Sequence, residues 1–248
     1  MARRKLTDTS HPDLTLDDQY WLTYGDSPQP PMRLKILYVT MDEVAKTGPM
    51  SFNVAHVCDR LGITYPMVNH YFGGRDALLA EAAHMVYDRF VSRVWNAVER
   101  APHNPKDRLA AWIRAEIEET VALGGWSGIL NYPLSAKEVS ELIYSTFGSQ
   151  MSQNFELNMA RLGLLVKDVL KNEVSAVYPR KGRINRQELL EDPALLAIVP
   201  TVVWSTFGAA TWSGGRHLPS RNIPELTSTV DRVLDSHIQR IVEFVETQ

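Results

Sequence analysis

Residues 62–79 read GITYPMVNHYFGGRDALL, and this stretch decides how the first part of the chain folds. Gly62 can end a helix, because glycine adopts the left-handed conformation at a helix C′ position at little cost. Thr64 can cap the next helix, and Pro66 falls in its first turn, where its missing N–H has no intrahelical partner. A Gly-Gly pair then precedes a strongly helical run. The stretch therefore predicts a short helix held between two glycine breaks.

The residues before this stretch predict two further helices. Residues 32–47 place apolar side chains on a broad helical stripe, and Gly48-Pro49 ends the run. Ser51 or Asn53 can cap a short second helix that ends at the Gly62 turn. Two short helices joined by such a turn form a helix-turn-helix, whose second helix lies in the major groove of DNA. An αα-hairpin in an ordinary helical bundle gives the same local pattern.

The rest of the chain has helical periodicity almost throughout, with no sustained period-two alternation that would predict strands. We expect helices over residues 75–100, from Pro105, from about Ser135 to Val177, from Pro193 to Ala210 and from Pro224. The predicted fold is therefore all-α: an N-terminal three-helix helix-turn-helix domain and a larger C-terminal helical bundle. We expect a polar N-terminal extension over residues 1–30, the first domain over 31–77 and the second over 78–248.

Composition narrows the class of protein. The net charge is −3, so any contact with nucleic acid must come from a local patch rather than from the whole chain. Cys58 is the single cysteine, which excludes an internal disulfide framework and fits a reducing compartment. The N-terminus lacks the apolar segment of a signal peptide, and no stretch approaches 18 uninterrupted apolar residues. We expect a cytoplasmic protein that does not enter a membrane.

The segment ILYVTMDEVAKTG…VAHVCDRLGITYPMVNHYFGGRDALL resembles the N-terminal DNA-binding domain of the TetR family of transcriptional regulators. The resemblance covers residues 33–80. It rests on the first helix ending at Gly48, the V-x-x-V-x-x-x-x-G-I brace and turn, the aromatic pair Tyr71-Phe72 and the R-D-A-L-L start of the next helix. It implies a regulator that binds double-stranded operator DNA as a homodimer and responds to a small-molecule effector. Repression is the majority behaviour of the family and is therefore the expected activity, with release from DNA by the effector.

The resemblance also implies which side chains meet DNA, while Val68 and Phe72 face the core. The DNA-facing set is Thr64, Tyr65, Met67, Asn69, His70 and Tyr71. The side-chain chemistry fits in part, because the amide of Asn69 matches the N6/N7 edge of adenine and tyrosine hydroxyls can position phosphates. His70 could equally be a solvated or capping histidine.

This segment departs from the family in its charge, since no Lys or Arg lies between Gly62 and Gly74. Arg75 stands where the family usually has a cation, and there it could engage a phosphate together with the amides at the helix start. Other cations of the small domain are Arg33, Lys35, Lys46 and Arg60. The basic run Arg3, Arg4 and Lys5 can form an arm in the minor groove, or it can be an ordinary solvated tail.

The C-terminal bundle is the expected effector domain. Its aromatic and sulfur-containing residues favour a mostly apolar pocket for a hydrophobic or aromatic effector, although each taken alone is also an ordinary core residue. The candidate lining residues are Trp95, Trp112, Trp126, Tyr132, Phe147, Met151, Phe155, Trp204 and Phe207. The resemblance further implies that effector binding moves the 75–100 helix and that the last two helices form the dimer interface.

Two other classes of protein remain as alternatives. An enzyme has little support, because GGWSG and TWSGG do not match G-x-S-x-G and follow no strand. The seven histidines show no H-x-x-x-H spacing, so we expect no catalytic residue, no metal site and no cofactor. A helical interaction or scaffold protein, whose helix-turn-helix no longer binds DNA, is kept open by the uncharged second helix.

Overall fold

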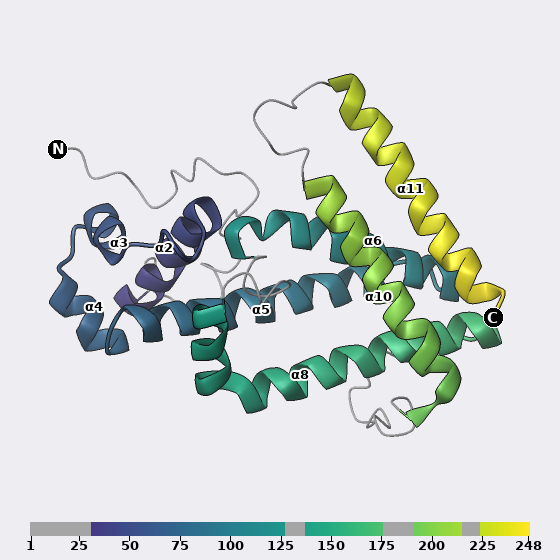
Figure 1. The fold of residues 1–248 in the computed structure, drawn as a ribbon, viewed down its shortest axis with the longest axis horizontal. Helices are drawn as coiled ribbons and strands as arrows, with labels where there is room; N and C mark the ends of the chain where they lie inside the picture. The colour runs from purple at the N-terminus through teal and green to yellow at the C-terminus, as the bar shows by residue number, and fades with distance from the viewer. Residues whose placement is uncertain (1–30, 127–136, 176–190, 215–223) are drawn as a thin grey trace. The chain divides into compact units, whose positions relative to one another are not determined.

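The structure is a computed structural model that describes residues 31–126, 137–175, 191–214 and 224–248 (Figure 1). Every regular element in these ranges is a helix, and the predicted all-α fold with an N-terminal helix-turn-helix and a larger helical part is confirmed. The chain forms two compact units. The first comprises Met1–Arg89 and Ala122–Gly148, and the second comprises Phe90–Val121 and Ser149–Gln248.

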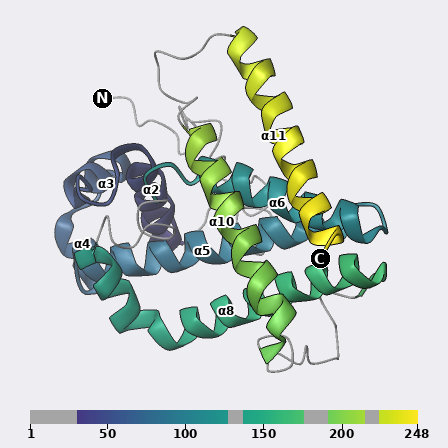
Figure 2. The ribbon, with the colours of Figure 1, turned by 45° about the vertical axis from the view of Figure 1, so that its right-hand side comes forward.

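The first unit contains the helices that the opening stretch predicts. These are α2 (Met32–Thr47), α3 (Val54–Leu61), α4 (Tyr65–Phe72) and the start of α5 (Arg75–Arg100). The predicted bounds of α2 and α5 are confirmed. Figure 2 shows α2, α3 and α4 gathered around the start of α5. Glycine breaks set the ends of the two short helices, because Gly62 and Gly73 both have left-handed φ values, of 65° and 80°.

α2 is buried over nearly its whole circumference. Nine consecutive residues, Ile36 to Val44, are buried, so the helix cannot be covered from one side only. A second cover comes from far along the chain: the 3₁₀ turn η2 (Gly124–Trp126) packs on α2. The Trp126 Nε1–H donates to the Met41 carbonyl oxygen at 2.8 Å, and a Cβ at Gly125 would lie 2.3 Å from the Val44 carbonyl oxygen. The first unit is therefore discontinuous in sequence.

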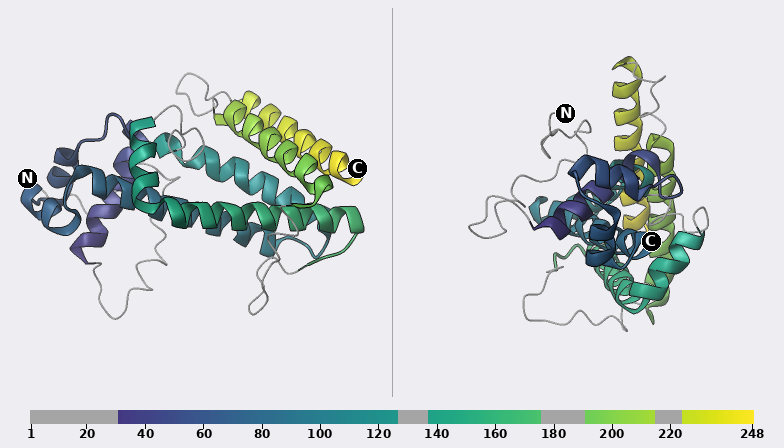
Figure 3. Two further views of the ribbon diagram at one scale, coloured as in Figure 1. Left: turned by 60° about the horizontal axis from the view of Figure 1, so that its bottom comes forward. Right: turned by 90° about the vertical axis from the view of Figure 1, so that its left-hand side faces the viewer.

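The second unit consists of most of α6 (Pro105–Ala122), parts of α5 and α8 (Lys137–Lys171), and α10 (Pro193–Gly214) and α11 (Pro224–Glu246). Side chains cap α6 and α10: the Asn104 side-chain oxygen accepts from the Lys106 N–H at 2.9 Å, and the Asp192 side-chain oxygen accepts from the Ala194 N–H at 2.9 Å. α10 and α11 lie side by side (Figure 3).

Polar contacts join the helices of the second unit. The Trp95 Nε1–H on α5 donates to Asn158 Oδ1 on α8 at 2.9 Å. The ring of His237 on α11 meets the Ser205 carbonyl oxygen of α10 at 3.2 Å. Two carboxylates of α11 are paired with α6, since Asp235 contacts Arg114 and Glu246 contacts Lys106. These contacts fix α11 against α6 on one side and α10 on the other.

The prediction that the long helix runs to about Val177 is wrong, because α8 ends at Lys171. Asn172 takes a positive φ of 51°, which turns the chain out of the helix. The Asp168 carboxylate then accepts from the Ser175 N–H at 2.8 Å and from its hydroxyl at 2.7 Å. Side-chain bonds to the backbone thus replace the last helical turns.

The predicted domain boundary at residue 77 stays a prediction. α5 runs through this position without a break and belongs to both compact units. The first unit also takes in residues 122–148, which the sequence assigned to the effector domain. A continuous helix therefore links the two units.

α10 is unusually apolar for a helix with so little cover. Over Pro193–Trp212 its mean hydropathy is 1.6, and 28% of the window is buried, so length and composition alone would allow it to cross a membrane. One such helix also occurs in the cores of soluble proteins and is weak evidence of a membrane span. Leu196, Trp204 and Trp212 are its exposed large apolar residues.

Candidate nucleic-acid interface

α4 presents one buried and one exposed face. Val68 is fully buried and Phe72 is nearly so, which confirms the core side that the resemblance implied. The predicted DNA-facing residues Thr64, Tyr65, Met67, Asn69 and His70 are exposed, and Tyr71 is half-buried. Burial of two apolar anchors on so short a helix sets its rotation, so the exposed set points in a fixed direction.

Local contacts hold the two ends of α4. Thr64 has the extended conformation of an N-cap, but its hydroxyl makes no capping bond, so it is available to another partner. At the other end the rings of His70 and Tyr71 meet edge to face with 5.4 Å between their centres. Phe72 lies under the guanidinium of Arg33, which is 4.8 Å from the ring centre. The C-terminal end of the helix is thus an aromatic cluster, with Phe72 in the core and His70 at the surface.

Fixed charge is balanced in this part of the chain. Residues 31–89 contain six Lys or Arg and six Asp or Glu, so their formal charges cancel. Each cation also has a partner. Arg33 pairs with Glu81 at 2.5 Å, and Lys35 and Arg89 make contacts of their own. Within residues 31–89, therefore, no Lys or Arg without an interaction partner is available to the exposed face of α4.

A buried pair of carboxylates in α2 takes up two more cations. Asp42 lies 2.8 Å from Lys46 and 2.7 Å from Arg60 of α3, and Glu43 lies 2.9 Å from the Nδ1 of His56. Both carboxylates are at most 9% exposed, so these pairs are shielded from solvent more than ordinary surface pairs. The cluster joins α3 to α2 and thereby holds the helix that braces α4.

Arg75 is occupied by the protein itself. Its guanidinium lies over the Phe52 ring and donates to the carbonyl oxygens of Pro49 and Phe52 at 3.3 and 3.4 Å. It also contacts the Asp76 carboxylate at 2.9 Å. The predicted phosphate contact stays a prediction, while the structure places the side chain on the loop before α3.

The predicted basic arm and the single cysteine are the remaining features of the N-terminal part. Arg3, Arg4 and Lys5, the predicted arm, lie outside the described residues. Cys58 is buried, and burial raises the pKa of its thiol, which suits a packing role rather than a reactive thiolate.

The predicted effector residues are divided between the two units. Trp126 belongs to the first unit under α2, whereas Trp95 and Trp112 are buried in the second. Trp204 on α10 is 72% exposed, and Phe207 is half-buried. Tyr132 lies outside the described residues. Phe147, Met151 and Phe155 lie on α8, but the structure does not describe their side chains. The effector pocket remains a prediction.

Sequence reasoning missed two buried carboxyls in the second unit, Asp168 on α8 and Glu116 on α6. Glu116 on α6 is 8% exposed, and burial, with a smaller effect of Glu119, raises its pKa to about 8. Its position four residues after Trp112 puts it on the apolar stripe of that helix, which was the available signal.

The chain is similar in sequence to several transcriptional regulators. No family model matches the chain. It is 25% identical over 113 residues to the HTH-type transcriptional regulator BetI 1 of Chromohalobacter salexigens, covering 42% of this chain and 56% of that protein. It is 28% identical over 93 residues to the HTH-type transcriptional regulator BetI of Brucella melitensis biotype 2, covering 37% and 46%. A BetI of Burkholderia cenocepacia is 30% identical over 93 residues, covering 36% and 45%. The chain thus spans about half the length of these curated relatives.

One solved structure has a similar fold across most of the chain. It is the crystal structure of a protein from Pseudomonas aeruginosa PAO1 described as a transcriptional regulator, with a TM-score of 0.54 and 16% identity. It covers 87% of this chain and 92% of its own, which shows a shared fold. BetI proteins are members of the TetR family. The resemblance predicted from the sequence is therefore confirmed: this all-α chain is similar to the helix-turn-helix transcriptional regulators of the TetR family.

Proposed function

We propose that the chain is a cytoplasmic, ligand-responsive transcriptional regulator that binds operator DNA as a homodimer and is released by a small hydrophobic or aromatic effector. Repression is the proposed activity. The observation that carries the proposal is α4, a short helix anchored by Val68 and Phe72 that presents Thr64, Asn69 and His70 to solvent. Names of the similar proteins support the same class.

Recognition would rest on hydrogen bonds and methyl contacts rather than on fixed charge. Asn69 offers a donor and an acceptor for an adenine edge, and Thr64 has an uncapped hydroxyl beside a methyl group. Met67 and Tyr65 add exposed apolar surface that suits thymine methyl groups and sugars. This arrangement supplies specificity, while the electrostatic part of affinity would be small.

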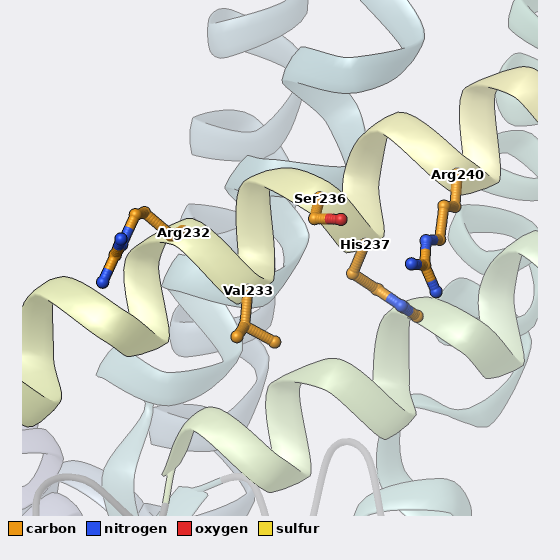
Figure 4. A pocket seen from close by; sticks show the side chains of 5 residues that line it. All are labelled: Arg232, Val233, Ser236, His237 and Arg240. Carbon is orange, nitrogen blue, oxygen red and sulfur yellow. The ribbon is translucent and has the colours of Figure 1, made fainter.

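The second unit supports a homodimer. Its α10 carries the exposed Trp204 and Trp212, and Val233 on α11 is 46% exposed. Arg232, Val233, Ser236, His237 and Arg240 line a groove of about 380 Å³ along one side of α11 (Figure 4). An isologous contact needs protruding and hollow surface on one patch, and α10 with α11 offers both. Dimerisation would set two copies of α4 about 34 Å apart, the spacing of successive major grooves.

Effector binding would act through α5. This helix starts at Arg75, directly after the glycines that end α4, and continues into the second unit. A ligand that favours one position of α5 would change the spacing of the two recognition helices and lower affinity for the operator.

The test is binding of the purified chain to the duplex that flanks its own gene. Asn69→Ala should weaken specific binding about tenfold and leave binding to an unrelated duplex unchanged. Gln239→Ala, an exposed amide on α11, is the matched control and should change neither. Equal loss on both duplexes would remove Asn69 from sequence recognition.

A helical interaction protein without DNA binding is the second candidate, and charge balance in residues 31–89 favours it. The same titration separates the two proposals. A dimer that fails to bind any duplex at low salt would support the interaction protein and overturn the regulator.

A further inference from the structure

We infer that Arg75 is a positioning residue that locks the loop before α3 to the start of α5, and that it is not the phosphate contact its place in the sequence suggests. The consequence for DNA binding rests on the proposed function, whereas the consequence for the loop does not.

The guanidinium contacts are directed at one short segment. Nε donates to the Phe52 carbonyl oxygen at 3.4 Å, and Nη2 donates to the carbonyl oxygens of Pro49 and Phe52 at 3.3 and 3.4 Å. The same group lies 5.6 Å from the centre of the Phe52 ring, which is 4% exposed. On its outer side Nη1 donates to Asp76 at 2.9 Å. All three guanidinium nitrogens of Arg75 therefore donate hydrogen bonds to residues of the first unit.

The connection that this side chain bridges has little else to fix it. Gly73 and Gly74 lie between α4 and α5, and open space surrounds the Cβ position of each. Residues 49–52 lead into Asn53, whose side chain caps α3. Arg75 thus ties the first residue of α5 to the segment that enters the bracing helix. The angle between α4 and α5 is held by this contact and by the buried anchors of α4.

Lysine cannot reproduce these contacts, although it keeps the charge. An ammonium group is a compact donor, whereas the planar guanidinium bonds two carbonyl oxygens and stacks on a ring at the same time. A phosphate contact would behave in the opposite way, because Lys also binds phosphate as a point charge. The conservative substitution therefore separates the two roles.

The first experiment measures amide hydrogen exchange in the full-length chain without DNA. Arg75→Lys should speed exchange over residues 49–54 about tenfold and leave α10 unchanged. The matched control is Arg33→Lys in the same unit, where the pair with Glu81 survives the change and exchange over 49–54 should match the wild type. Wild-type exchange over 49–54 in Arg75→Lys would overturn the inference.

The second experiment measures affinity for the duplex flanking the gene as salt is varied. Arg75→Lys and Arg75→Gln should each weaken binding about tenfold, with the slope of log affinity against log salt equal to that of the wild type. A slope shallower by about 0.9 in Arg75→Gln, with full affinity in Arg75→Lys, would identify a phosphate contact and overturn the inference. Failure of the wild type to bind would count against the proposed function alone, since the exchange experiment still decides the role of Arg75.

Discussion

The face of α4 and the face formed by α10 and α11 use charge in opposite ways. Around α4 every Lys and Arg of residues 31–89 has an interaction partner. On α11, among the described residues, neither Arg232 nor Arg240 has a hydrogen-bond or ion-pair partner, and on α10 Trp204 is exposed. Cations of the first unit hold helices in place, as Lys106 and Arg114 do in the second unit, whereas Arg232 and Arg240 lie on the surface that we propose for the dimer.

The two units also use the same residue type differently. Trp126 is fully buried and hydrogen-bonded in the first unit, whereas Trp204 is 72% exposed in the second. Burial assigns the Trp126 indole to stability, whereas the exposed Trp204 indole is available to the proposed dimer contact. Substitutions at these two positions therefore test whether Trp126 contributes to stability and Trp204 to self-association.

The largest effect is expected at Trp126. Trp126→Ala should lower the free energy of unfolding by about 3–5 kcal/mol, because it leaves a cavity under α2 and removes the bond to Met41. Trp126→Phe keeps most of the volume and should cost about 1 kcal/mol for the lost hydrogen bond. Denaturant unfolding measures both, and equal stability of Trp126→Ala and the wild type would contradict the assignment.

A smaller effect is expected at Trp204, and of another kind. Trp204→Ala should leave the unfolding free energy of the subunit nearly unchanged but weaken self-association by about 2 kcal/mol, roughly 30-fold. Sedimentation equilibrium measures the dissociation constant. Thr211→Ala, on the exposed part of the same helix, serves as the control. If Trp204→Ala self-associates as tightly as the wild type does, Trp204 is not part of a dimer interface.

A third effect, of similar size, is a pH dependence of the unfolding free energy that originates in the second unit. Glu116 has a pKa of about 8 in the folded chain, raised by burial and by Glu119 from an ordinary value of 4.5. Between these values the folded state keeps a proton that the unfolded chain releases, so the free energy of unfolding falls as pH rises. The loss should be on the order of 2 kcal/mol between pH 6 and 8.

Glu116→Gln should remove this slope, because the amide is neutral at every pH. Glu118→Gln, an exposed carboxylate on the same helix, should leave the slope in place. Urea unfolding at several pH values is the measurement, and an equal slope in Glu116→Gln and the wild type would exclude Glu116 as its source.

Sequence predicted the helices of the first unit well because glycine, proline and capping residues act locally. Gly48, Gly62 and Gly73 mark ends that need no knowledge of the rest of the chain. The end of α8 was missed for the opposite reason: Asp168 and Ser175 bond each other only after the helix has already turned.

The sequence predicts which face of α4 is exposed, but it does not predict what the charged Arg75 side chain contacts. The exposed face of α4 follows from helical spacing around Val68 and Phe72. Sequence shows that Arg75 carries a charge, but its carbonyl partners lie more than twenty residues earlier, where spacing rules give no guidance. The bond from Trp126 to the Met41 carbonyl oxygen is equally beyond spacing rules, since the two residues are 85 positions apart.

The docking of Gly125 on α2 has a consequence for dissecting the protein. A fragment that stops at Arg89 would contain all of α2, α3 and α4 and yet lack the turn that covers α2. Its Met41 carbonyl would lose the indole donor, and apolar surface of a central helix would meet water. An autonomous recognition module therefore needs residues 122–126 supplied through a short linker, as a circularly rearranged chain would do.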